Sequence, residues 1–332
     1  MYKALITGSD GFIGSHLVES LVKDGIQVKA FCFYNSNNSW GWLDTLSNDV
    51  KKNIDVYLGD IRDPYSVKEA MRGCDIVFHL AALIGIPYSY ISPSSYVDTN
   101  IHGTLNIVQS ARELNLKKIV HTSTSETYGS AQFVPINESH PLVGQSPYAA
   151  TKIGADQIAL SYQKSFGTPV TILRPFNTYG PRQSARAVIP TIISQILSGK
   201  KELKLGSLTP TRDFNFVIDT CNAFKAVAES DMTIGKVINS SSNFEISILE
   251  TANLISQIMN VDLTFVSEKE RVRPKDSEVN RLLGDNKLLK EITDWMPKYG
   301  GRSGLEEGLK ITIEWFSQQK NLDFYKSNSY TI

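Results

Sequence analysis

The sequence predicts an α/β protein built on a doubly wound parallel sheet, because short apolar segments alternate with amphipathic ones through its first half. Strands are expected at residues 4–7, 28–33, 56–58, 76–80, 119–122 and 170–173. Helical patterns lie between several of them, at 12–23, 66–72, 100–114 and 148–166. Strands that alternate with helices form βαβ units, and the strands of such units are parallel.

The pattern changes after residue 177, where Pro, Arg and Gly cluster at 175–186. Helices are then expected at 188–198, 248–259 and 304–318, and strands at 202–205, 213–218 and 236–239. This mixture predicts a smaller α+β portion over 178–332. Segments near 213–240 are expected to return to the sheet domain, 1–177, so that the two portions are interleaved. The last dozen residues are polar, and we expect them to be loosely held.

The composition is that of a soluble globular protein, with 41% hydrophobic residues, 20% charged residues and zero net charge. No basic excess points to nucleic acid, and no apolar run approaches ~18 residues, so we expect a cytoplasmic protein without a membrane partner. Cys32, Cys74 and Cys221 are widely spaced, and we interpret them as buried thiols in a reducing compartment. The five histidines have no ligand spacing, so no metal is expected.

The segment ITGSDGFIG places Gly8, Gly11 and Gly14 between a predicted strand and a predicted helix. Glycines there permit a tight turn and a close backbone approach, and the helix start offers free N–H groups to a pyrophosphate. The segment, with Phe12 and Ile13 inside it, therefore predicts a Rossmann-type dinucleotide site. The alternative is an ordinary strand–helix turn.

The choice between the two nicotinamide cofactors is normally made at the end of the second strand, where an acid binds the ribose and repels a 2′-phosphate. Here that strand ends AFCFYNS, without an acid or an arginine. Ser36, Asn37 and Ser39 could donate hydrogen bonds to a phosphate. We expect NADP or NAD, with a slight preference for NADP.

Tyr148 and Lys152 stand four residues apart in SPYAATKIGAD, which puts them on one face of a helix. A cation beside a phenol favours the phenolate and lowers the phenol pKa. We therefore expect Tyr148 to serve as a base near neutral pH. A hydroxyl cluster that includes Thr124 lies about two dozen residues upstream.

These motifs together resemble the extended short-chain dehydrogenase/reductase family of nucleotide-sugar epimerases and dehydratases, over nearly the whole chain. The resemblance implies that Asp60 and Ile61 flank the adenine and that Leu80, Ala81 and Ala82 line the cofactor. It also implies that the substrate diphosphate is met by residues in RPFNTYGPRQ, RDFNFVID and RVRPKDSEV, namely Asn177, Arg182, Arg212 and Arg273. An arginine fork suits a diphosphate, although each arginine alone could be a solvated surface charge. Relatives pair through two long helices, which implies a homodimer with a four-helix seam at about 100–114 and 148–166.

The subclass is indicated by Thr124-Ser125-Glu126. Simple 4-epimerases have no acid beside the hydroxyl, whereas this run resembles the GDP-mannose dehydratase branch; the dTDP-glucose branch has Asp where Ser125 stands. Oxidation at C4 of a hexose acidifies the C5 proton, and Glu126 would remove it. Either Ser125 or Glu126 could deliver the proton to the C6 hydroxyl. The alternative is that Glu126 is an exposed turn residue.

The segments 83–100 and 35–46 resemble the dehydratases that act on nucleotide-activated N-acetylglucosamine in bacterial nonulosonic (legionaminic-type) acid pathways. Tyr88, Ser89 and Tyr90 stand where relatives meet the hexose. Aromatic packing at a domain seam is the alternative for these residues, and we interpret Trp40 and Trp42 as packing residues.

The leading hypothesis is thus a 4,6-dehydratase acting on UDP- or GDP-linked N-acetylglucosamine or a related hexose. A UDP-glucuronate decarboxylase also carries Thr-Ser-Glu, but it needs a cation for the sugar carboxylate, and 83–100 contains no Lys or Arg. A UDP-hexose 4-epimerase is a further hypothesis of the same enzyme class. A dinucleotide-sensing scaffold is a hypothesis of a different class, since a fold alone does not determine a function.

Overall fold

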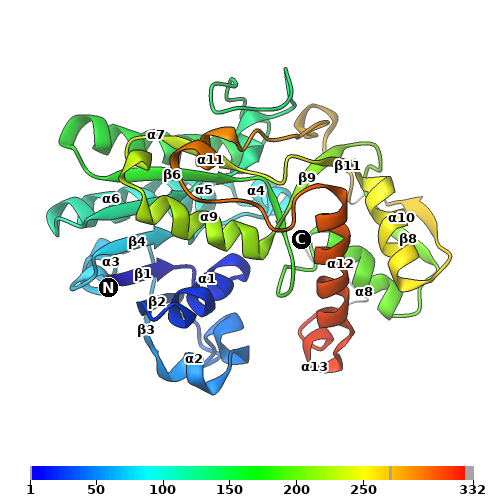
Figure 1. Ribbon diagram of the computed structural model, residues 1–332, viewed down its shortest axis with the longest axis horizontal. Helices are drawn as coiled ribbons and strands as arrows, with labels where there is room; N and C mark the ends of the chain where they lie inside the picture. Colours follow the sequence, from blue (N-terminus) through cyan, green and yellow to red (C-terminus); the bar gives the residue numbers. More distant parts are fainter. Residues whose placement is uncertain (1, 269–270, 326–332) are drawn as a thin grey trace.

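The computed structural model describes residues 2–268 and 271–325. A seven-stranded parallel sheet in the order β10-β6-β5-β4-β1-β2-β3 forms its centre (Figure 1). Its strands are β1 (Lys3–Thr7), β2 (Gln27–Phe33), β3 (Ile54–Gly59), β4 (Ile76–His79), β5 (Lys118–Thr122), β6 (Val170–Pro175) and β10 (Val237–Ser240). The expected α/β class is confirmed. The expectation of a loosely held terminus falls partly on 326–332, outside the described residues.

Helices cover both faces of this sheet, which explains why its strands are nearly continuous apolar runs. On one face α1 (Phe12–Lys23) packs against α9 (Val217–Glu229), and on the other α6 (Gly103–Glu113) packs against both α3 (Pro64–Met71) and α7 (Pro147–Phe166). The expectation of a strand over 213–218 is wrong at its end. Strand β9 stops at Phe216, and the following residues begin helix α9, which the sequence pattern does not predict.

The remaining elements form two small sheets and a set of helices beyond the edge of the main sheet. One sheet has the order β11-β9-β7 and the other pairs β12 with β8. The strands are β7 (Asn177–Tyr179), β8 (Glu202–Leu205), β9 (Thr211–Phe216), β11 (Glu245–Ser247) and β12 (Thr264–Ser267). The helices are α2 (Asn48–Lys52), α4 (Ile86–Ile91), α5 (Pro93–Tyr96), α8 (Val188–Leu197), α10 (Ile248–Met259), α11 (Lys287–Ile292), α12 (Gly301–Ser317) and α13 (Gln319–Leu322). The division of the chain at residue 177 stays a prediction.

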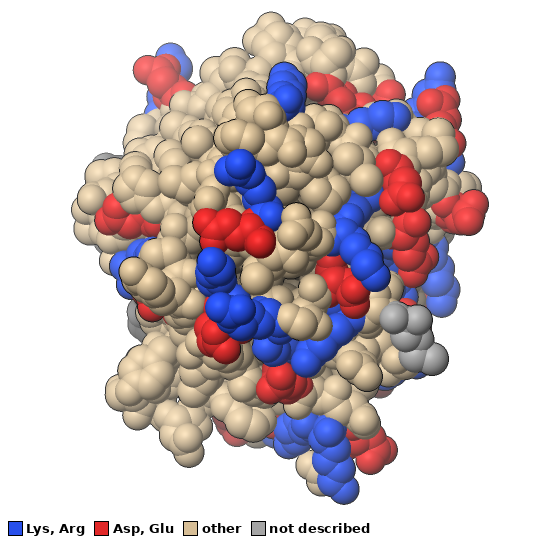
Figure 2. Space-filling view, turned by 90° about the vertical axis from the view of Figure 1, so that its left-hand side faces the viewer, with Lys and Arg blue, Asp and Glu red and all other residues tan. Residues whose placement is uncertain are grey.

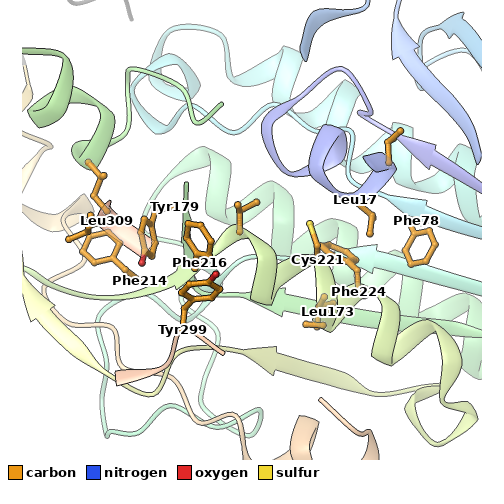
Figure 3. Packing of buried hydrophobic residues seen from close by; sticks show 14 of the residues in the cluster. Leu17, Phe78, Leu173, Tyr179, Phe214, Phe216, Cys221, Phe224, Tyr299 and Leu309 are labelled. Carbon is orange, nitrogen blue, oxygen red and sulfur yellow. The ribbon is translucent and has the colours of Figure 1, made fainter. Parts of the chain in front are cut away.

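One hydrophobic cluster runs from the main sheet into these small elements (Figure 3). Phe78 of β4 meets Phe224 of α9, with ring centroids 6.3 Å apart. Further along, Phe216 stacks obliquely on Tyr299 at 4.5 Å, and Tyr179 packs on Phe216 at 5.4 Å. A continuous core of this kind fixes the small elements relative to the sheet.

The surface agrees with the even charge balance of the sequence. Lys and Arg side chains are interspersed with Asp and Glu over the face in Figure 2. In the described part of the chain no helix is long and apolar enough to cross a membrane. Cys32 and Cys221 are buried as expected, but Cys74 is only half-buried. The expected packing role of Trp42 is confirmed by its ring contact with Trp315.

The contact of α12 with Tyr179 generates a stability prediction. A Cβ on Gly308 would lie 2.1 Å from the Tyr179 hydroxyl oxygen, which itself donates to the Leu305 carbonyl at 3.2 Å. Gly308→Ala should lower the free energy of unfolding by about 1–3 kcal/mol through overpacking, as measured by urea denaturation.

Tyr179→Phe removes the clashing oxygen, so adding it to the Gly308→Ala protein should recover part of that loss. If the double variant loses as much stability as the two single variants added together, or more, the clash is not the cause of the destabilisation.

Candidate active site

A cavity of about 910 Å³ opens where the carboxyl ends of the parallel strands meet the small elements. It begins at the crevice between β1 and β4, from which the chain winds outward in both directions, the usual ligand position in such sheets. Most of the predicted site residues line it: Gly8, Gly11, Phe12, Ile13, Gly14, Leu80, Ala81, Ala82, Tyr88, Thr124, Ser125, Glu126, Tyr148, Lys152, Asn177, Arg212 and Arg273.

The glycine loop has the geometry that a dinucleotide requires. Gly8 has φ +71°, and a Cβ there would lie 2.8 Å from the Ala81 nitrogen. A Cβ on Gly14 would lie only 2.1 Å from the Gly8 carbonyl oxygen. The backbone is therefore packed too closely for any side chain at these two positions, and the residues that begin α1 line the cavity. These residues fit a nicotinamide dinucleotide, with the pyrophosphate at the helix start.

Three residues expected to bind the cofactor do not line the cavity. Ser36 is exposed, and Ile61 is buried against Gly103, where a Cβ would come within 2.6 Å of its side chain. Asp60 is held by Arg62, whose Nε donates to both carboxylate oxygens at 2.9 and 3.0 Å. The structure thus brings the glycine loop and the Leu80–Ala82 segment together, but not these three side chains.

The hydroxyl–acid run forms a short turn directly after β5. Thr124 caps this turn by accepting a hydrogen bond from the Glu126 backbone nitrogen at 3.3 Å. Ser125 and Glu126 are 1% and 7% exposed, and both line the cavity. The alternative that Glu126 is an exposed turn residue is wrong, because the turn directs it inward.

Helix α7 presents the tyrosine and the lysine to the same cavity. Ser146 caps the helix by accepting from the Ala149 nitrogen at 3.1 Å, and Pro147 occupies its first turn, where a proline is tolerated. Tyr148 follows and hydrogen-bonds the Thr124 side chain. One turn later Lys152 donates to the Thr122 carbonyl oxygen at 2.7 Å. Thr124, Tyr148 and Lys152 are therefore brought together by the turn after β5 and by α7.

The electrostatics of this group differ from our expectation. Burial raises the pKa of Tyr148 well above its ordinary value, and the negative charge of Glu126 raises it further, against the lowering effect of the Thr124 hydrogen bond. Burial also lowers the pKa of Lys152 to about 8, against the attraction of Asp156. The expected lowering of the Tyr148 pKa is therefore not found, because burial raises this pKa more than the Thr124 hydrogen bond lowers it.

A buried ionic network, which the sequence pattern does not predict, holds α7 against the main sheet. Asp156 is fully buried and accepts from Ser123 Oγ at 2.6 Å and from Arg174 Nη2 at 2.8 Å. Its other oxygen lies 3.2 Å from His121 Nε2. His121, Arg174 and the charge of Lys152 hold the pKa of Asp156 at about 2 despite burial. Asp156 follows Lys152 by four residues, about one helical turn, and this spacing is the sequence signal that could have predicted the network.

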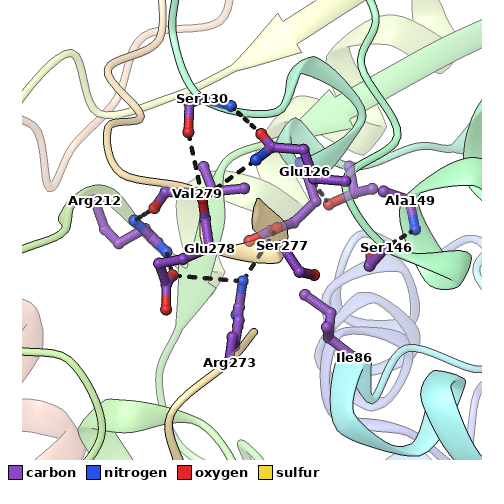
Figure 4. A network of polar contacts seen from close by, with 12 residues as sticks. Ile86, Glu126, Ser130, Ser146, Ala149, Arg212, Arg273, Ser277, Glu278 and Val279 are labelled. Atoms are coloured by element: carbon purple, nitrogen blue, oxygen red, sulfur yellow. Dashed lines mark hydrogen bonds and ion pairs between the residues drawn. The ribbon is translucent and has the colours of Figure 1, made fainter. Parts of the chain in front are cut away.

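Two arginines and two glutamates face one another above the catalytic turn (Figure 4). Arg273 Nη1 lies 3.5 Å from Glu126 Oε2 and 3.9 Å from Glu278 Oε1. Arg212 donates to the Glu278 carboxylate at 3.3 Å and to the Val279 carbonyl at 2.7 Å. Arg212 is only 6% exposed, so it is not a solvated surface charge. We name these four charged residues the arginine–glutamate cluster.

Aromatic side chains also contribute to the cavity. Tyr88 lines the cavity, and its ring lies 6.1 Å from that of Tyr96, which in turn lies 6.3 Å from that of Tyr148. Ser89 is fully buried and donates to the Ile86 carbonyl, while Tyr90 hydrogen-bonds Ser277 at 2.6 Å. Of the three residues expected at the hexose, only Tyr88 lines the cavity.

The segment after β6 carries three polar side chains, of which two line the cavity and one does not. Asn177 lines the cavity, and its buried Oδ1 has no hydrogen-bond partner among the described residues. Arg182 does not line the cavity, because it pairs with Glu19 of α1 at 2.8 Å. Arg186, which the sequence analysis does not single out, lines the cavity beside Gly85, with Nη1 3.5 Å from the position of a Cβ there. A cation thus reaches the 83–100 segment from another part of the chain.

A π-helical turn, Val97–His102, begins the element that we expected as one helix over 100–114. Within it Asn100 accepts from the Leu83 nitrogen at 2.9 Å and donates to the Leu83 carbonyl and to Thr151. Such turns recur at functional sites. Here the turn links the cavity wall at Leu83 to the helix that carries Tyr148.

The glycine loop, the Thr–Tyr–Lys group and the cavity are the features of an extended short-chain dehydrogenase/reductase. Residues 5–308 match the family described as GDP-mannose 4,6 dehydratase. The chain belongs to this family. In the described residues no group of three His, Cys, Asp or Glu side chains could hold a metal ion.

Known relatives include all three reaction types considered above. The UDP-N-acetyl-α-D-glucosaminuronate decarboxylase of Bacillus cytotoxicus is 34% identical over 96% of this chain and 99% of its own length. The UDP-N-acetylglucosamine 4-epimerase of Methanobrevibacter ruminantium, solved with UDP-N-acetylmuramic acid, has a TM-score of 0.84, 32% identity, and coverage of 96% and 99%. The dTDP-glucose 4,6-dehydratase DesIV of Streptomyces venezuelae, solved with NAD, has a TM-score of 0.86, 26% identity, and coverage of 98% and 99%.

The buried lysine generates a pH-dependent stability prediction. The Lys152 pKa is about 8 in the folded protein, against about 10.4 for an unperturbed lysine, so between these values the unfolded chain binds more protons. The free energy of unfolding should therefore rise between pH 7.5 and 9.5 by roughly 2 kcal/mol more in the wild type than in Lys152→Met. Urea denaturation at both pH values measures this difference.

Lys164 is an exposed lysine of the same helix, and Lys164→Met is the matched control. Its free energy of unfolding should rise between pH 7.5 and 9.5 by as much as that of the wild type. Equal pH dependence in wild type and Lys152→Met would contradict the lowered pKa of Lys152.

Proposed function

We propose that this protein is a nucleotide-sugar 4,6-dehydratase, a hydro-lyase whose substrate is a UDP- or GDP-linked N-acetylglucosamine or a related hexose. The product is the 4-keto-6-deoxy sugar. The observation that carries this proposal is the inward position of Glu126, which shares the cavity with Tyr148 and is close enough for its charge to raise the Tyr148 pKa.

The first step is removal of the C4 hydroxyl proton by Tyr148. Thr124 hydrogen-bonds Tyr148, and the Lys152 ammonium is fixed one helical turn away by the Thr122 carbonyl. The glycine loop would hold a nicotinamide dinucleotide, whose chemistry would supply a positive charge and the hydride acceptor for C4 and donor for C6. Because burial raises the pKa of Tyr148, positive charge beside the phenol would favour its action as a base.

The second step is loss of water across C5 and C6. The C4 ketone acidifies the C5 proton, and the Glu126 carboxylate takes it. The C5–H electrons form the C5=C6 double bond, and the C6 hydroxyl leaves as water after receiving a proton. That proton comes from Ser125 or from the newly protonated Glu126. Both side chains are buried in the cavity wall, where bulk water does not compete for the proton.

The arginine–glutamate cluster gives the substrate diphosphate a role in this sequence. Arg212 and Arg273 are the groups suited to bind the diphosphate. In the structure Arg212 pairs with Glu278, and Arg273 pairs with Glu126. A bound diphosphate would replace these carboxylates at the guanidinium groups, and Glu126 would then be free to turn to the hexose.

The N-acetylated hexose is supported by the two relatives of highest identity named above, whose names both specify an N-acetylated sugar nucleotide. Tyr88 lines the cavity, and its ring offers an apolar surface of the kind that packs against a sugar face and an acetyl methyl group. The resemblance of segments 35–46 and 83–100 to legionaminic-type dehydratases supports the same substrate class.

A sugar-nucleotide uronate decarboxylase is the second candidate, and Arg186 is the observation that favours it. Segment 83–100 itself contains no Lys or Arg that could bind a sugar carboxylate. Arg186 supplies a cation from outside that segment, because it lines the cavity beside Gly85. A guanidinium there could bind the C6 carboxylate of a uronic acid.

Mass spectrometry of reactions with UDP-, GDP-, CDP- and dTDP-linked sugars, including N-acetylglucosamine and the glucuronates, separates these candidates. Loss of one water from one N-acetylglucosamine nucleotide is the expected result. Loss of carbon dioxide from a uronate would establish the decarboxylase instead. An unchanged mass with a new sugar stereochemistry would establish a 4-epimerase, and inertness on the whole panel would favour a dinucleotide sensor.

The role of Glu126 yields a mutational prediction. Glu126→Gln should lower the rate of water loss by roughly 10²–10⁴-fold, because the general base is removed. Oxidation at C4 should persist, since it depends on Tyr148. Single-turnover absorbance at the reduced-nicotinamide band and mass spectrometry of the product measure the two steps separately.

Glu278→Gln is the matched control from the same cluster, and it should change KM while leaving the rate of water loss close to wild type. Tyr148→Phe should lose both steps and still bind the cofactor. Normal dehydration by Glu126→Gln would exclude Glu126 as the elimination base.

We also propose that the chain forms a cytoplasmic homodimer through α6 and α7, which pack side by side on one face of the sheet (Figure 1). Leu105 of α6 and Ile153 of α7 remain partly exposed on these helices. Analytical ultracentrifugation gives the mass in solution, and Ile153→Glu should shift a dimer toward the monomer.

A further inference from the structure

Two segments that carry charged residues of the site lie against each other. One is the catalytic turn, Ser125–Tyr128, which holds Glu126. The other is the segment 273–280, which we name the arginine arm because Arg273 begins it. Their side chains meet where Arg273 Nη1 lies 3.5 Å from Glu126 Oε2. Their backbones are joined elsewhere, by a side chain that belongs to neither segment.

That side chain is Gln145, two residues before the start of α7. Its Oε1 accepts from the Ser130 nitrogen at 2.5 Å. Its Nε2 donates to the Asp276 carbonyl oxygen at 3.0 Å and to the Glu278 carbonyl oxygen at 3.2 Å. A glutamine amide suits this place because its oxygen accepts and its nitrogen donates. Gln145 therefore bonds the chain just beyond the catalytic turn to two backbone carbonyls of the arginine arm.

Gly129 fixes the end of the turn beside Gln145. It has φ +64°, and a Cβ there would collide with Gln145 Oε1 and lie 2.9 Å from the Val143 carbonyl oxygen. The Gly129 nitrogen donates to the Glu126 carbonyl oxygen at 3.2 Å. The backbone of Glu126 is thus tied through one short turn to the place where Gln145 binds.

The arm itself is fixed from two sides. Ser130 Oγ accepts from the Asn280 nitrogen at 3.0 Å on the side of the turn. On the side of β9, Arg212 donates to the Val279 carbonyl oxygen at 2.7 Å, and this bond is buried. The arm therefore offers the turn a rigid support.

Gln145 acts on the site only through its neighbours. It is half-buried and is not among the described residues that line the catalytic cavity. It lines instead a second hollow of about 620 Å³, together with Arg273 and Glu278. Any effect of Gln145 on the reaction must therefore pass through the groups to which it bonds.

The two kinds of contact between turn and arm respond differently to an anion. A diphosphate competes with Glu126 for the Arg273 guanidinium, because both are anionic acceptors. The bonds of Gln145 end on backbone amide and carbonyl groups, which a diphosphate does not displace. Loss of the ion pair therefore leaves the turn attached to the arm through Gln145.

We propose that Gln145 is a positioning residue that keeps the catalytic turn docked on the arginine arm while Arg273 exchanges Glu126 for the substrate diphosphate. Glu126 then reaches the hexose by rotation of its side chain, and the turn stays in place. Without Gln145 the same exchange releases the turn, and a misplacement of about 1 Å can cost about 10²-fold in rate. The inference rests on the proposed function, because it takes the diphosphate to bind at the two arginines.

Hydrogen-exchange mass spectrometry on the full-length protein tests the docking without turnover. UDP, GDP, CDP and dTDP are added one at a time, and exchange is followed in peptides that cover 124–131 and 273–280. In the wild type, a nucleoside diphosphate that binds should slow exchange in the arm and should not speed exchange in the turn. In Gln145→Leu the same ligand should still slow the arm, but exchange in the turn should rise by about threefold or more.

Gln145→Glu separates the two ends of the contact. Its carboxylate still accepts from the Ser130 nitrogen but cannot donate to the carbonyls of the arm, so the ligand should speed exchange in the turn as in Gln145→Leu. Gln132→Leu makes the same change at an exposed glutamine of the preceding loop, and it should behave as the wild type. Circular dichroism shows whether each variant is folded.

The reaction gives a second measurement. At saturating substrate, Gln145→Leu should slow water loss by about fivefold or more. C4 oxidation should stay close to the wild-type rate, because Tyr148 is held by α7 and Asp156 attaches that helix to the main sheet. Equal slowing of both steps would show a general disturbance of the site and would overturn the proposal.

Other outcomes would also overturn it. One is a ligand that slows the arm but leaves exchange in the turn alike in the wild type and in folded Gln145→Leu. Another is faster exchange of the turn in the ligand-bound wild type, and a third is an arm that no nucleoside diphosphate protects. Failure to dehydrate any sugar would overturn the proposed function and leave the exchange results in force, so the two proposals fail separately.

Discussion

The buried carboxylate of Asp156 is the interaction on which the arrangement of the site depends. It joins α7 to β5 through Ser123 and His121, and to β6 through Arg174. These are the strands whose carboxyl ends lead to Thr124 and Asn177. Because a buried ion left without its partner costs about 3–5 kcal/mol, the helix that carries Tyr148 and Lys152 cannot shift relative to either strand without a large penalty.

The same network determines which charges act on Tyr148 and Lys152. The Arg174 guanidinium lies 4.6 Å from the centre of the Tyr128 ring and pairs with Asp156, so its positive charge is compensated by the carboxylate rather than presented to the cavity. Lys152 is then the cation nearest to Tyr148 on α7, and burial weakens its hold on a proton. With a pKa of about 8, Lys152 is still largely protonated at neutral pH, so it is the positive charge that α7 itself supplies one turn from Tyr148.

The arginine–glutamate cluster, by contrast, has balanced charges that suit exchange for an anion. Arg212 and Arg273 are paired with Glu126 and Glu278, and each guanidinium is at least partly removed from solvent. A diphosphate carries more charge than a carboxylate, which is why we propose that it replaces the carboxylates at these guanidinium groups. The two parts of the cavity thus differ in kind, as the proposed binding of a dinucleotide and a nucleotide sugar requires.

Local pattern determined the strand–helix alternation, the glycine turn and the i, i+4 placement of Tyr148 and Lys152, because each depends only on neighbouring residues and on the period of a helix or strand. Helix α9 was missed because its apolar face follows directly from β9 without a turn signal. Six expected contact residues (Ser36, Asp60, Ile61, Ser89, Tyr90 and Arg182) lie away from the cavity lining, since family position gives a residue's place in the chain but not its partner. Only the tertiary structure put Gln145 beside Glu278, Arg186 beside Gly85 and Glu126 next to Arg273. Those meetings join segments far apart in the sequence, and the packing of the sheet, not any local preference, decides them.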